Sequence, residues 1–589
     1  MLTTFAERNH NPNTEMKQAL MDIINTLSLM AYGEAKNYYY LSSVDPGVGK
    51  STAIIEWLKA FIYGFPDLEE VGVLLCLDTY DEIKHYIEES KVPSDRFAVY
   101  VTKTHENNNL GLGRENTDQA RLLITTKDQI KRRSKGNNFD SVSEFYYHGK
   151  PRQVRIWDES LFQGRGLQLK RSSLGSLYEI LENTRPDLYK KVVKIFDCIG
   201  EHNDGDTLQM PELDVSLNEM LSIFYDEKLK SVKHREILET LCLMSGKAVT
   251  VRTADVCTIL VDCVEDMPND FTPCLIADAS GRVREIYKLH EKERGNLFRL
   301  KTAEKKYTNL TYHIWRTSSG RDAYNKKLLI LAEEIVKVIQ QKPGEEFLII
   351  HHLPRDKYGR DDLKAAILKY LENDTERIHF LHYGLHTATN KFAAVPNVIL
   401  AGTLFYKVAD YEGIGRAEAN RPTVKGKFSN DEIDRVRKGE SAHHLLQAAC
   451  RGAIRKSEGD TCPDTNLWII TAPQTGIEDL LPNLFPGSKK TTWKTTAISL
   501  TGRRKAAYDF IKFEFDKGVT TIHLKNVLSV EGVNIPDSSL FRREIYNKPD
   551  FQEAITELGV VLEGKGKNAR FIRPDYSSYF GFIESNDEQ

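Results

Sequence analysis

A glycine-bearing loop between two apolar segments near the N-terminus is the feature that most limits how this chain can fold. Residues 37–41 are aromatic and apolar enough to form a buried strand, and residues 53–62 carry apolar side chains at helical spacing. The loop between them ends with Pro46, Gly47, Val48, Gly49, Lys50, Ser51 and Thr52. Glycines let backbone N–H groups turn toward an anion, and the start of a helix adds about half a positive charge. The order of strand, loop and helix therefore predicts a phosphate-binding loop in an α/β domain.

The residue types of this loop suit a nucleotide bound together with a magnesium ion. Lys50 is expected to reach the β- and γ-phosphates of ATP, and the Ser51 hydroxyl is expected to bind Mg²⁺. One position departs from the usual pattern, because Val44 stands where its first glycine is expected. The alternative is a chance Gly-Lys-Ser in an ordinary loop, but the flanking strand and helix favour the phosphate-binding loop.

A second apolar run ends in two acidic residues and supplies the other half of a nucleotide site. Residues 153–157 form a β-type run, and Asp158 and Glu159 follow it about 100 residues after the glycine loop. Asp158 is expected to hold Mg²⁺, usually through water, and Glu159 to orient and deprotonate the attacking water. Together with the loop, this pair predicts an ATP hydrolase.

Length and composition describe an ordinary globular chain of several domains. With 589 residues, 40% hydrophobic and 28% charged, two to four domains are expected. No apolar run approaches the ~20 residues of a membrane span, and no signal peptide precedes the first domain. The eight cysteines are scattered and match no metal-binding spacing, which indicates reduced thiols in a cytoplasmic protein. The net charge of −3 argues against a surface that binds nucleic acid all over, but not against a local basic groove.

A second strand–helix series follows, and after it a segment with regularly spaced polar residues. Residues 346–352, 378–382 and 397–402 are expected to be strands, and residues 441–455 are expected to be one helix. Gln447, Arg451 and Arg455 would then lie on one face of that helix, four residues apart. Arginines so placed suit an arginine finger, which can be worth about 10³–10⁵ in rate. The alternative is a salt-bridged surface face, worth about 0.5 kcal/mol per pair.

These motifs resemble those of a superfamily 2, DEAD/DEAH-like helicase of a phage, plasmid or bacterial type. The Gln-x-x-x-Arg-Gly-x-x-Arg segment is similar to the family's Gln-x-x-Gly-Arg-x-x-Arg, with Cys450 in place of the glycine and the second arginine one residue late. Either Arg451 or Arg455 could therefore be the finger. The resemblance covers about residues 14–475 and implies two RecA-like lobes and ATP-driven translocation along, or unwinding of, nucleic acid.

The resemblance also implies further contact residues. In such helicases, loops after the strands touch the nucleic-acid backbone, which makes Thr125 and Thr126 candidates, although both could instead be ordinary helix caps. Asn390 lies where the family places a residue that contacts the nucleotide or the backbone. The strand at residues 273–277 ends in Asp-Ala-Ser, which partly resembles the Ser-Ala-Thr motif that links the ATP site to nucleic-acid movement.

We therefore expect an α/β fold of two lobes with two additional parts. Residues 1–160 and 271–300 would form the first lobe, 161–270 an inserted and mostly helical subdomain, 301–500 the second lobe, and 501–589 a winged-helix-like domain. Within the insertion, residues 163–171 are expected to form a solvated basic loop. In the last domain, a β-hairpin with a basic tip would meet phosphates, or the domain would instead bind a protein. The candidates for phosphate contact are Arg542, Arg543, Lys565, Lys567 and Arg570.

Two functions fit these expectations. The first is an ATP-dependent helicase or translocase that acts on nucleic acid, with DNA favoured over RNA. The second is an ATP-driven switch that recruits a protein partner through the insertion or the C-terminal domain, in replication of a mobile element or in defence, without strand separation. No membrane partner is expected.

Overall fold

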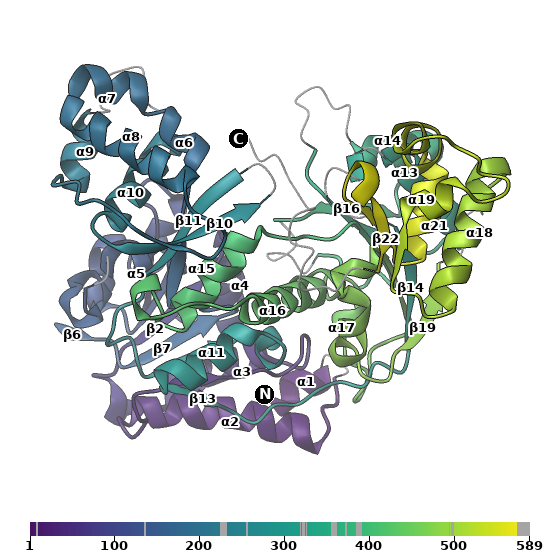
Figure 1. Ribbon diagram of the computed structural model, residues 1–589. Helices are drawn as coiled ribbons and strands as arrows, with labels where there is room; N and C mark the ends of the chain where they lie inside the picture. Colours follow the sequence, from purple (N-terminus) through teal and green to yellow (C-terminus); the bar gives the residue numbers. More distant parts are fainter. Residues whose placement is uncertain are drawn as a thin grey trace. The chain divides into compact units, whose positions relative to one another are not determined.

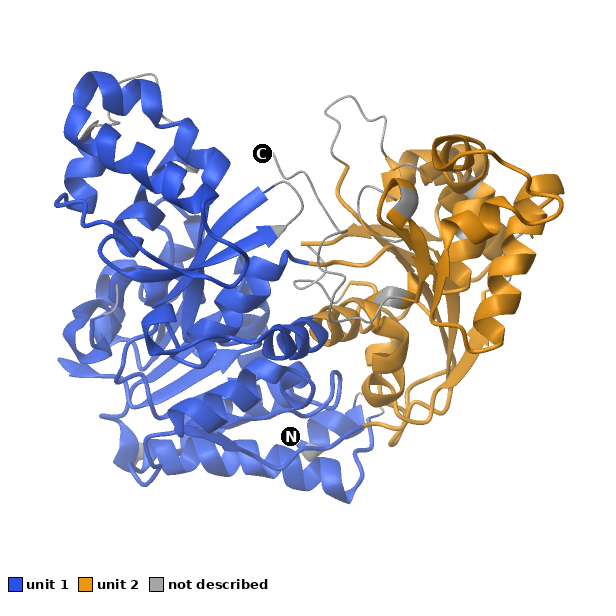
Figure 2. Ribbon diagram, in the orientation of Figure 1, with its two compact units in different colours: residues 1–304, 406–440 blue, residues 305–405, 441–589 orange. Residues whose placement is uncertain are grey.

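The computed structural model describes residues 1–7, 10–134, 137–223, 232–254, 257–317, 320, 324–325, 327–354, 362–371, 374–384, 391–493, 495 and 500–573. The chain divides into two compact units, which are coloured separately in Figure 2. Unit 1 comprises residues 1–304 and 406–440, and unit 2 comprises residues 305–405 and 441–589.

Unit 1 is built on a parallel sheet, which has seven strands among the described residues, in the order β13-β1-β12-β7-β2-β4-β3 (Figure 1). The strands are β1 (Tyr39–Leu41), β2 (Val73–Leu77), β3 (Phe97–Tyr100), β4 (Leu122–Thr126), β7 (Val154–Asp158), β12 (Cys274–Ala277) and β13 (Leu297–Arg299). Every residue of β2 and β3 is buried, as is typical of a parallel sheet covered on both faces. The predicted strands of this lobe are confirmed, and β3 and β13 are additional.

Two groups of helices cover the two faces of this sheet. On one face, α2 (Thr14–Ala31), α3 (Lys50–Gly64) and α4 (Tyr80–Ser90) pack against Leu75 and Leu77 of β2. On the other face, α5 (Lys127–Ser134), α11 (Glu285–Arg294), α15 (Val408–Glu418) and the start of α16 (Asn430–Ala449) share a core with Leu74 and Cys76. Alternate side chains of one strand thus pack against the helices on opposite faces of the sheet, which makes this a three-layer α/β unit. Two short strands, β5 (Tyr146–Tyr147) and β6 (Lys150–Pro151), and the helix α1 (Leu2–Glu7) complete the lobe.

The insertion has its own core and contains more β-structure than expected. Its helices are α6 (Arg171–Gly175), α7 (Tyr178–Thr184), α8 (Pro186–Gly200), α9 (Leu217–Ile223) and α10 (Val232–Met244). Its antiparallel sheet has, in the part of the chain that is described, four strands in the order β8-β11-β10-β9. They are β8 (Gly164–Lys170), β9 (Thr207–Gln209), β10 (Ala248–Ala254) and β11 (Cys257–Glu265).

Strand β8 corrects the expectation of a solvated basic loop at residues 163–171. Leu167 and Leu169 are buried in the core of the insertion, and Gly166 and Gln168, on the opposite face of the strand, contact α15. Arg165 is on the same face as the two leucines but is exposed, and it pairs with Glu239 and Asp266. The whole of β8 pairs with β11, so this segment is a strand of the sheet.

Residues 406–440 group with unit 1, although the sequence placed them in the second lobe at 301–500. The reason is a close contact between α15 and β8. A Cβ atom added at Gly413 would lie 2.7 Å from the Cα atom of Gly166, and the reverse distance is also 2.7 Å. Two glycines therefore let the helix backbone lie directly on the strand backbone. Around this contact, Arg252 donates to Glu412 at 2.5 Å, and Arg416 donates to the same carboxylate at 2.7 Å.

Unit 2 contains a second parallel sheet, with six strands among its described residues in the order β16-β15-β17-β18-β14-β19. They are β14 (Leu310–Arg316), β15 (Phe347–His351), β16 (Ile378–His382), β17 (Asn397–Ala401), β18 (Thr465–Thr471) and β19 (Lys489–Thr492). Helices α13 (Leu328–Gln340) and α14 (Leu363–Leu371) cover one face and share a core with Ile349 and Ile399. Helix α17 (Ile477–Leu484) follows β18. The two parallel sheets, one in each unit, are consistent with tandem RecA-like lobes.

The C-terminal part of unit 2 forms a separate hydrophobic core. Its elements are α18 (Gly502–Asp516), β20 (Thr521–His523), α19 (Leu524–Leu528), α20 (Ser538–Phe541), η11 (Arg542–Tyr546), α21 (Pro549–Glu557), β21 (Val561–Glu563) and β22 (Arg570–Ile572). The three strands form an antiparallel sheet in the order β20-β22-β21. The predicted hairpin at the end of the domain is confirmed, since β21 and β22 are adjacent and antiparallel.

None of the helices that the structure describes combines the length and the apolar character that crossing a membrane requires.

The glycine contact gives a test of the α15–β8 packing. Alanine at a helix-interior glycine normally stabilises by about 1 kcal/mol. Gly413→Ala is instead expected to destabilise the protein by about 1–3 kcal/mol, because its Cβ would overlap Gly166. The measurement is the midpoint of thermal unfolding. The control is Gly175→Ala, where an added Cβ meets no atom within 4 Å, and equal midpoints for the two variants would contradict the packing argument.

Candidate active site

The phosphate-binding loop lies where β1 ends and α3 begins. Gly47 and Gly49 have φ angles of 80° and 121°, which L side chains rarely adopt. Gly49 is also the residue before the first turn of α3, and a Cβ added there would lie 2.5 Å from Cζ of Phe5. Conformation and space therefore both require glycine at this position. The N–H groups at the start of α3 and the turned loop suit an anion such as a phosphate.

Val44 shows why the loop tolerates its departure from the usual pattern. Its φ is not positive, so no glycine is needed there, and its side chain is fully buried in the core of the lobe. Its backbone carbonyl accepts a hydrogen bond of 2.5 Å from Nζ of Lys50. Val44 thus stabilises the loop through its backbone carbonyl and through the apolar packing of its side chain.

The acidic pair follows β7 at the same edge of the sheet. Asp158 is the last residue of the strand, and Glu159 has a φ of 64°, in the left-handed region. A non-glycine residue pays about 1–2 kcal/mol for this conformation. The Glu159 N–H donates to the carbonyl of Ala277 at 3.3 Å, which ties the residue to the end of β12. Such strain is found at functional sites, where the surrounding structure maintains it.

The loop and the acidic pair meet at one side chain from α4. The Tyr86 hydroxyl donates to Oδ2 of Asp158 at 2.7 Å, and the Ser51 side chain lies near the same hydroxyl, where it opposes the rise in the pKa of Tyr86 that burial causes. The hydroxyl and carboxylate oxygens of Ser51 and Asp158 are the donor types that Mg²⁺ prefers. The donor set therefore fits the magnesium ion that accompanies a nucleotide.

Cations compensate the buried negative charge at this site. Burial raises the pKa of Asp158, although the hydrogen bond from Tyr86 and the charges of Lys127 and Lys50 oppose the shift. Lys127 follows β4 and is buried, and its Nζ lies 2.7 Å from Oδ2 of Asp78 and 3.5 Å from the carbonyl of Ser160. Burial disfavours the charge of Lys127, but Asp78 outweighs it, so the pKa of Lys127 is raised. A fixed positive charge thus stands beside the acidic pair.

The two threonines at the end of β4 differ. Thr125 is fully buried, and its hydroxyl donates to the carbonyl of Tyr100 at 2.6 Å. The structure therefore contradicts the side-chain contact to nucleic acid expected of Thr125, because its hydroxyl faces the sheet. Thr126 is half-buried at the carboxyl end of the strand.

A buried charge network next to the acidic pair escaped the sequence analysis. Asp278 follows β12 and accepts hydrogen bonds from Ser160 at 3.1 Å and from Tyr287 at 2.8 Å. Arg284 contacts Asp278 at 3.3 Å and donates twice to Glu440 of α16, at 2.9 and 2.6 Å. Burial disfavours the charge of Arg284, but Glu440 and Asp278 outweigh it, so the pKa of Arg284 is raised. The available signal was the Asp-Ala-Ser after a strand, but the sequence could not indicate its partners.

Unit 2 holds the glutamine–arginine segment, and its geometry corrects a prediction. Helix α16 ends at Ala449, so Gln447 lies on the helix, Arg451 lies in the turn after it, and Arg455 belongs to η9 (Ala453–Arg455). The three residues do not share one helix face. Arg451 donates to Oε1 of Gln447 at 2.7 Å and is buried.

Gly452 explains why the helix ends there. A Cβ at this residue would lie 2.9 Å from the carbonyl oxygen of Val395, and the next residue, Ala453, donates its N–H to that same carbonyl at 2.8 Å. The chain leaves the helix to bond with the segment before β17. Lys305 then donates to the carbonyls of Ile454, Arg455 and Lys456 at 2.9, 2.8 and 3.2 Å. The backbone that carries Arg455 is therefore held in place by a buried lysine.

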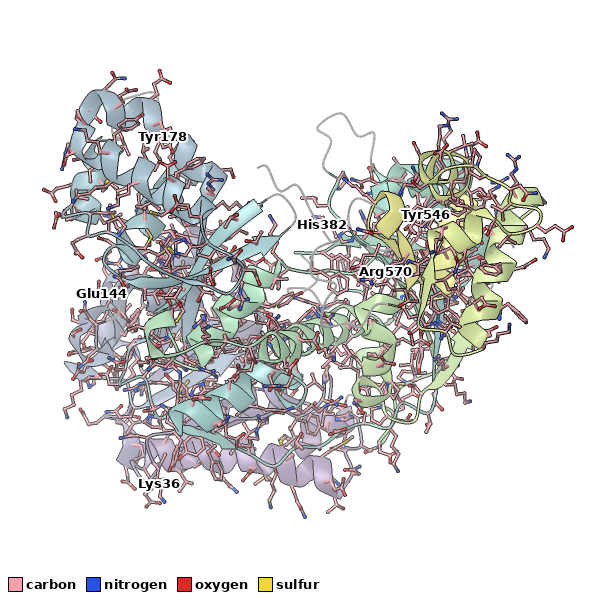
Figure 3. The ribbon with its side chains drawn as sticks, viewed as in Figure 1. Lys36, Glu144, Tyr178, His382, Tyr546 and Arg570 are labelled. Atoms are coloured by element: carbon pink, nitrogen blue, oxygen red, sulfur yellow. The ribbon has the colours of Figure 1, made fainter. Side chains whose placement is uncertain are left out.

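The remaining predicted residues differ in their exposure and in their hydrogen-bond partners. Asn390 lies outside the described residues. Arg543 and Lys565 are exposed, and Arg542 donates to the carbonyl of Gly564 at 2.6 Å. Arg570, labelled with Tyr546 in Figure 3, is exposed and pairs with Glu563 at 2.9 Å. The side chain of Lys567 is not described, although its backbone belongs to the turn between β21 and β22.

The comparisons with known proteins give likeness only at the level of structure. No protein-family model matches the chain, and no curated protein matches its sequence. Among solved structures, Xpd4 from S. tokodaii is 12% identical with a TM-score of 0.46, covering 81% of this chain and 100% of that one. An apo XPD structure is 13% identical with a TM-score of 0.45, covering 80% and 99%. The helicase MrfA bound to DNA is 10% identical with a TM-score of 0.35, covering 96% and 60%.

Of these three structures, MrfA is called a helicase in its name. The identities and TM-scores of all three are low, so we base the proposed function on the residues of this chain.

The charge network predicts a large cost for losing one partner. Glu440→Ala is expected to destabilise the protein by about 3–5 kcal/mol, because it leaves Arg284 buried with part of its charge uncompensated. The control is Glu291→Ala, which breaks an exposed pair with Arg299 and is expected to cost about 1 kcal/mol or less. Urea unfolding of both variants measures the difference, and a cost for Glu440→Ala as small as that of the control would contradict the network's role.

Proposed function

We propose that this chain is an ATP-dependent helicase or translocase that acts on nucleic acid, with DNA favoured. The observation that carries the proposal is the meeting of the glycine loop and the acidic pair at the carboxyl edge of a parallel sheet, where the Tyr86 hydroxyl donates to Asp158 and lies near Ser51. Open α/β sheets bind their ligands at this edge. The second parallel sheet in unit 2 supports a tandem arrangement of lobes.

The residues of the loop suit binding of the triphosphate. The glycines and the start of α3 offer N–H groups to the phosphates, and Lys50 would exchange the Val44 carbonyl for the β- and γ-phosphate oxygens. When bound, Mg²⁺ would neutralise charge on these oxygens, held by Ser51 and by Asp158.

Glu159 is the proposed general base. Water attacks the γ-phosphorus, its proton goes to the Glu159 carboxylate, and the bond to the β-phosphate oxygen breaks, giving ADP and phosphate. The fixed left-handed backbone of Glu159 supports this role, because it holds the carboxylate at one place relative to β7 and β12. Gln447, Arg451 or Arg455, together with Asn390, would respond to the nucleotide, one arginine serving as the finger.

The C-terminal part of the chain supports a contact with nucleic acid. Its order of helices and strands, α18-β20-α19-α20-η11-α21-β21-β22, fits a winged-helix-like domain, in which the hairpin of β21 and β22 is the wing. Between residues 500 and 573 the chain has thirteen Lys and Arg against ten Asp and Glu, so this part is basic in a chain of net charge −3. We propose that the wing meets the phosphates of DNA, with Thr126 a further contact in unit 1.

The first experiment is the ATPase rate with and without single-stranded DNA. We expect the polynucleotide to raise the rate by about 10-fold or more, and Lys50→Ala to reduce it to the background of the assay, because the phosphates lose their cation. RNA of the same length tests the preference for DNA. Hydrolysis that requires Lys50 but is indifferent to every polynucleotide would instead favour the ATP-driven switch that recruits a protein partner.

The arginine segment gives a second test. Replacing the finger by alanine is expected to lower kcat by about 10³-fold or more, with KM for ATP changed far less, because the charge acts in the transition state. Arg451→Ala and Arg455→Ala are compared by steady-state kinetics with saturating DNA. Arg437→Ala, which removes a pair with Asp434 of the same helix, is the control, and a similar small loss in all three variants would rule out a finger in this segment.

The hairpin gives a third test. Lys565→Ala combined with Lys567→Ala is expected to weaken DNA binding several-fold at low salt and to reduce the salt slope of log Kd by about 2. Fluorescence anisotropy over a salt series measures both quantities. The control combines Lys512→Ala, in α18, with Lys517→Ala, directly after that helix. These two lysines pair with Asp516 and Glu514. An unchanged slope would point to a protein-binding wing.

A further inference from the structure

Tyr86 lies at the nucleotide site without belonging to either of its motifs. It is on α4, the helix that follows β2, and its side chain is 2% exposed. The start of α4 is fixed by a capping box, in which the Thr79 hydroxyl accepts from the N–H of Glu82 and the Glu82 carboxylate accepts from the N–H of Thr79. Ile83 of the same helix is in the core of the lobe. Tyr86 therefore projects from a rigid element.

The phenol joins two groups from different parts of the chain. It donates its single proton to Oδ2 of Asp158 at 2.7 Å, and the Ser51 side chain lies near the same hydroxyl. Because that proton goes to the carboxylate, the phenol oxygen can act toward Ser51 only as an acceptor.

This direction of donation affects both proposed oxygen ligands. On Asp158, Oδ2 is held by the phenol, which orients the carboxylate. A Ser51 hydroxyl that donates to the phenol oxygen would direct its own lone pairs toward a cation. Tyr86 would thus preset the two groups before any ion binds.

We propose that Tyr86 is a positioning residue for the divalent cation that accompanies ATP, and that it sets the affinity of the site for that cation. The inference rests on the proposed function, because it concerns the same nucleotide site. Packing alone does not explain a tyrosine here, since phenylalanine would fill the core equally well and would not require a buried partner for a hydroxyl.

Tyr86→Phe tests the inference because it removes one oxygen and keeps the ring. In EDTA, we expect this variant to bind a fluorescent ATP analogue with unchanged Kd. When Mg²⁺ is added, the Kd for the analogue falls, and we expect the variant to need about 10-fold more Mg²⁺ than the unmodified protein to reach half of that decrease. In the ATPase assay, the Mg²⁺ concentration for half-maximal rate is expected to rise by a similar factor, with the rate at saturating Mg²⁺ within about 3-fold of the unmodified protein.

The matched control is Tyr39→Phe. Tyr39 is also 2% exposed and lies on β1 of the same sheet. It is expected to leave the Mg²⁺ requirement unchanged. An equal shift in the two variants would show general loosening of the lobe and overturn the inference.

A double variant separates positioning from an independent effect. If Tyr86 acts through Ser51, then adding Tyr86→Phe to Ser51→Ala changes the Mg²⁺ requirement by less than about 3-fold, whereas independent effects would multiply. An unchanged Mg²⁺ requirement in Tyr86→Phe alone overturns the inference and leaves the proposed ATPase intact. Failure of the unmodified protein to bind the ATP analogue would instead remove the proposed function, and the inference with it.

Discussion

The parallel direction of the strands in unit 1 is the constraint on which the candidate site depends. Because β1, β2, β4, β7 and β12 all run the same way, the loops that follow them gather at one edge of the sheet. These loops carry the phosphate-binding glycines, the acidic pair and the cation Lys127. Residues more than a hundred positions apart are thereby brought within hydrogen-bond distance, and burial of both sheet faces holds the strands in register.

The charged side chains at this edge are buried, so each of them needs a defined partner. Asp158 and Asp278 lie where solvation is poor, and each is surrounded by hydrogen-bond donors. In such surroundings an uncompensated charge is costly, so every carboxylate has a defined partner. Lys127 and Arg284 provide the matching positive charge. The site is therefore a set of fixed dipoles and charges, which is the arrangement that favours phosphoryl transfer.

Close backbone contacts have a similar role in holding the larger parts in place. Glycines at positions 166 and 413 allow α15 to lie on β8, and this contact attaches residues 406–440 to unit 1. Gly452 ends α16 because the chain there approaches the segment before β17. Neither effect has a local signature, since a glycine in a helix pattern looks the same whether it meets solvent or a second backbone.

The sequence by itself determined the elements that local patterns encode. Strand, glycine loop and helix at residues 39–64, the run into Asp158, the strands β15, β16 and β17 and the C-terminal hairpin all follow from apolar periodicity and turn residues. It also supplied the candidate residues of the phosphate loop, because their types are tied to phosphate chemistry.

Tertiary structure alone decided the rest. The Thr125 hydroxyl is buried, and α16 ends before Arg451. Residues 164–170 form a strand, and Tyr86 lies between the loop and the acidic pair. The physical reason is that these outcomes depend on long-range contacts. A hydroxyl, an arginine or a tyrosine takes its role from the group it meets across the fold, and that group is not encoded in the neighbouring residues.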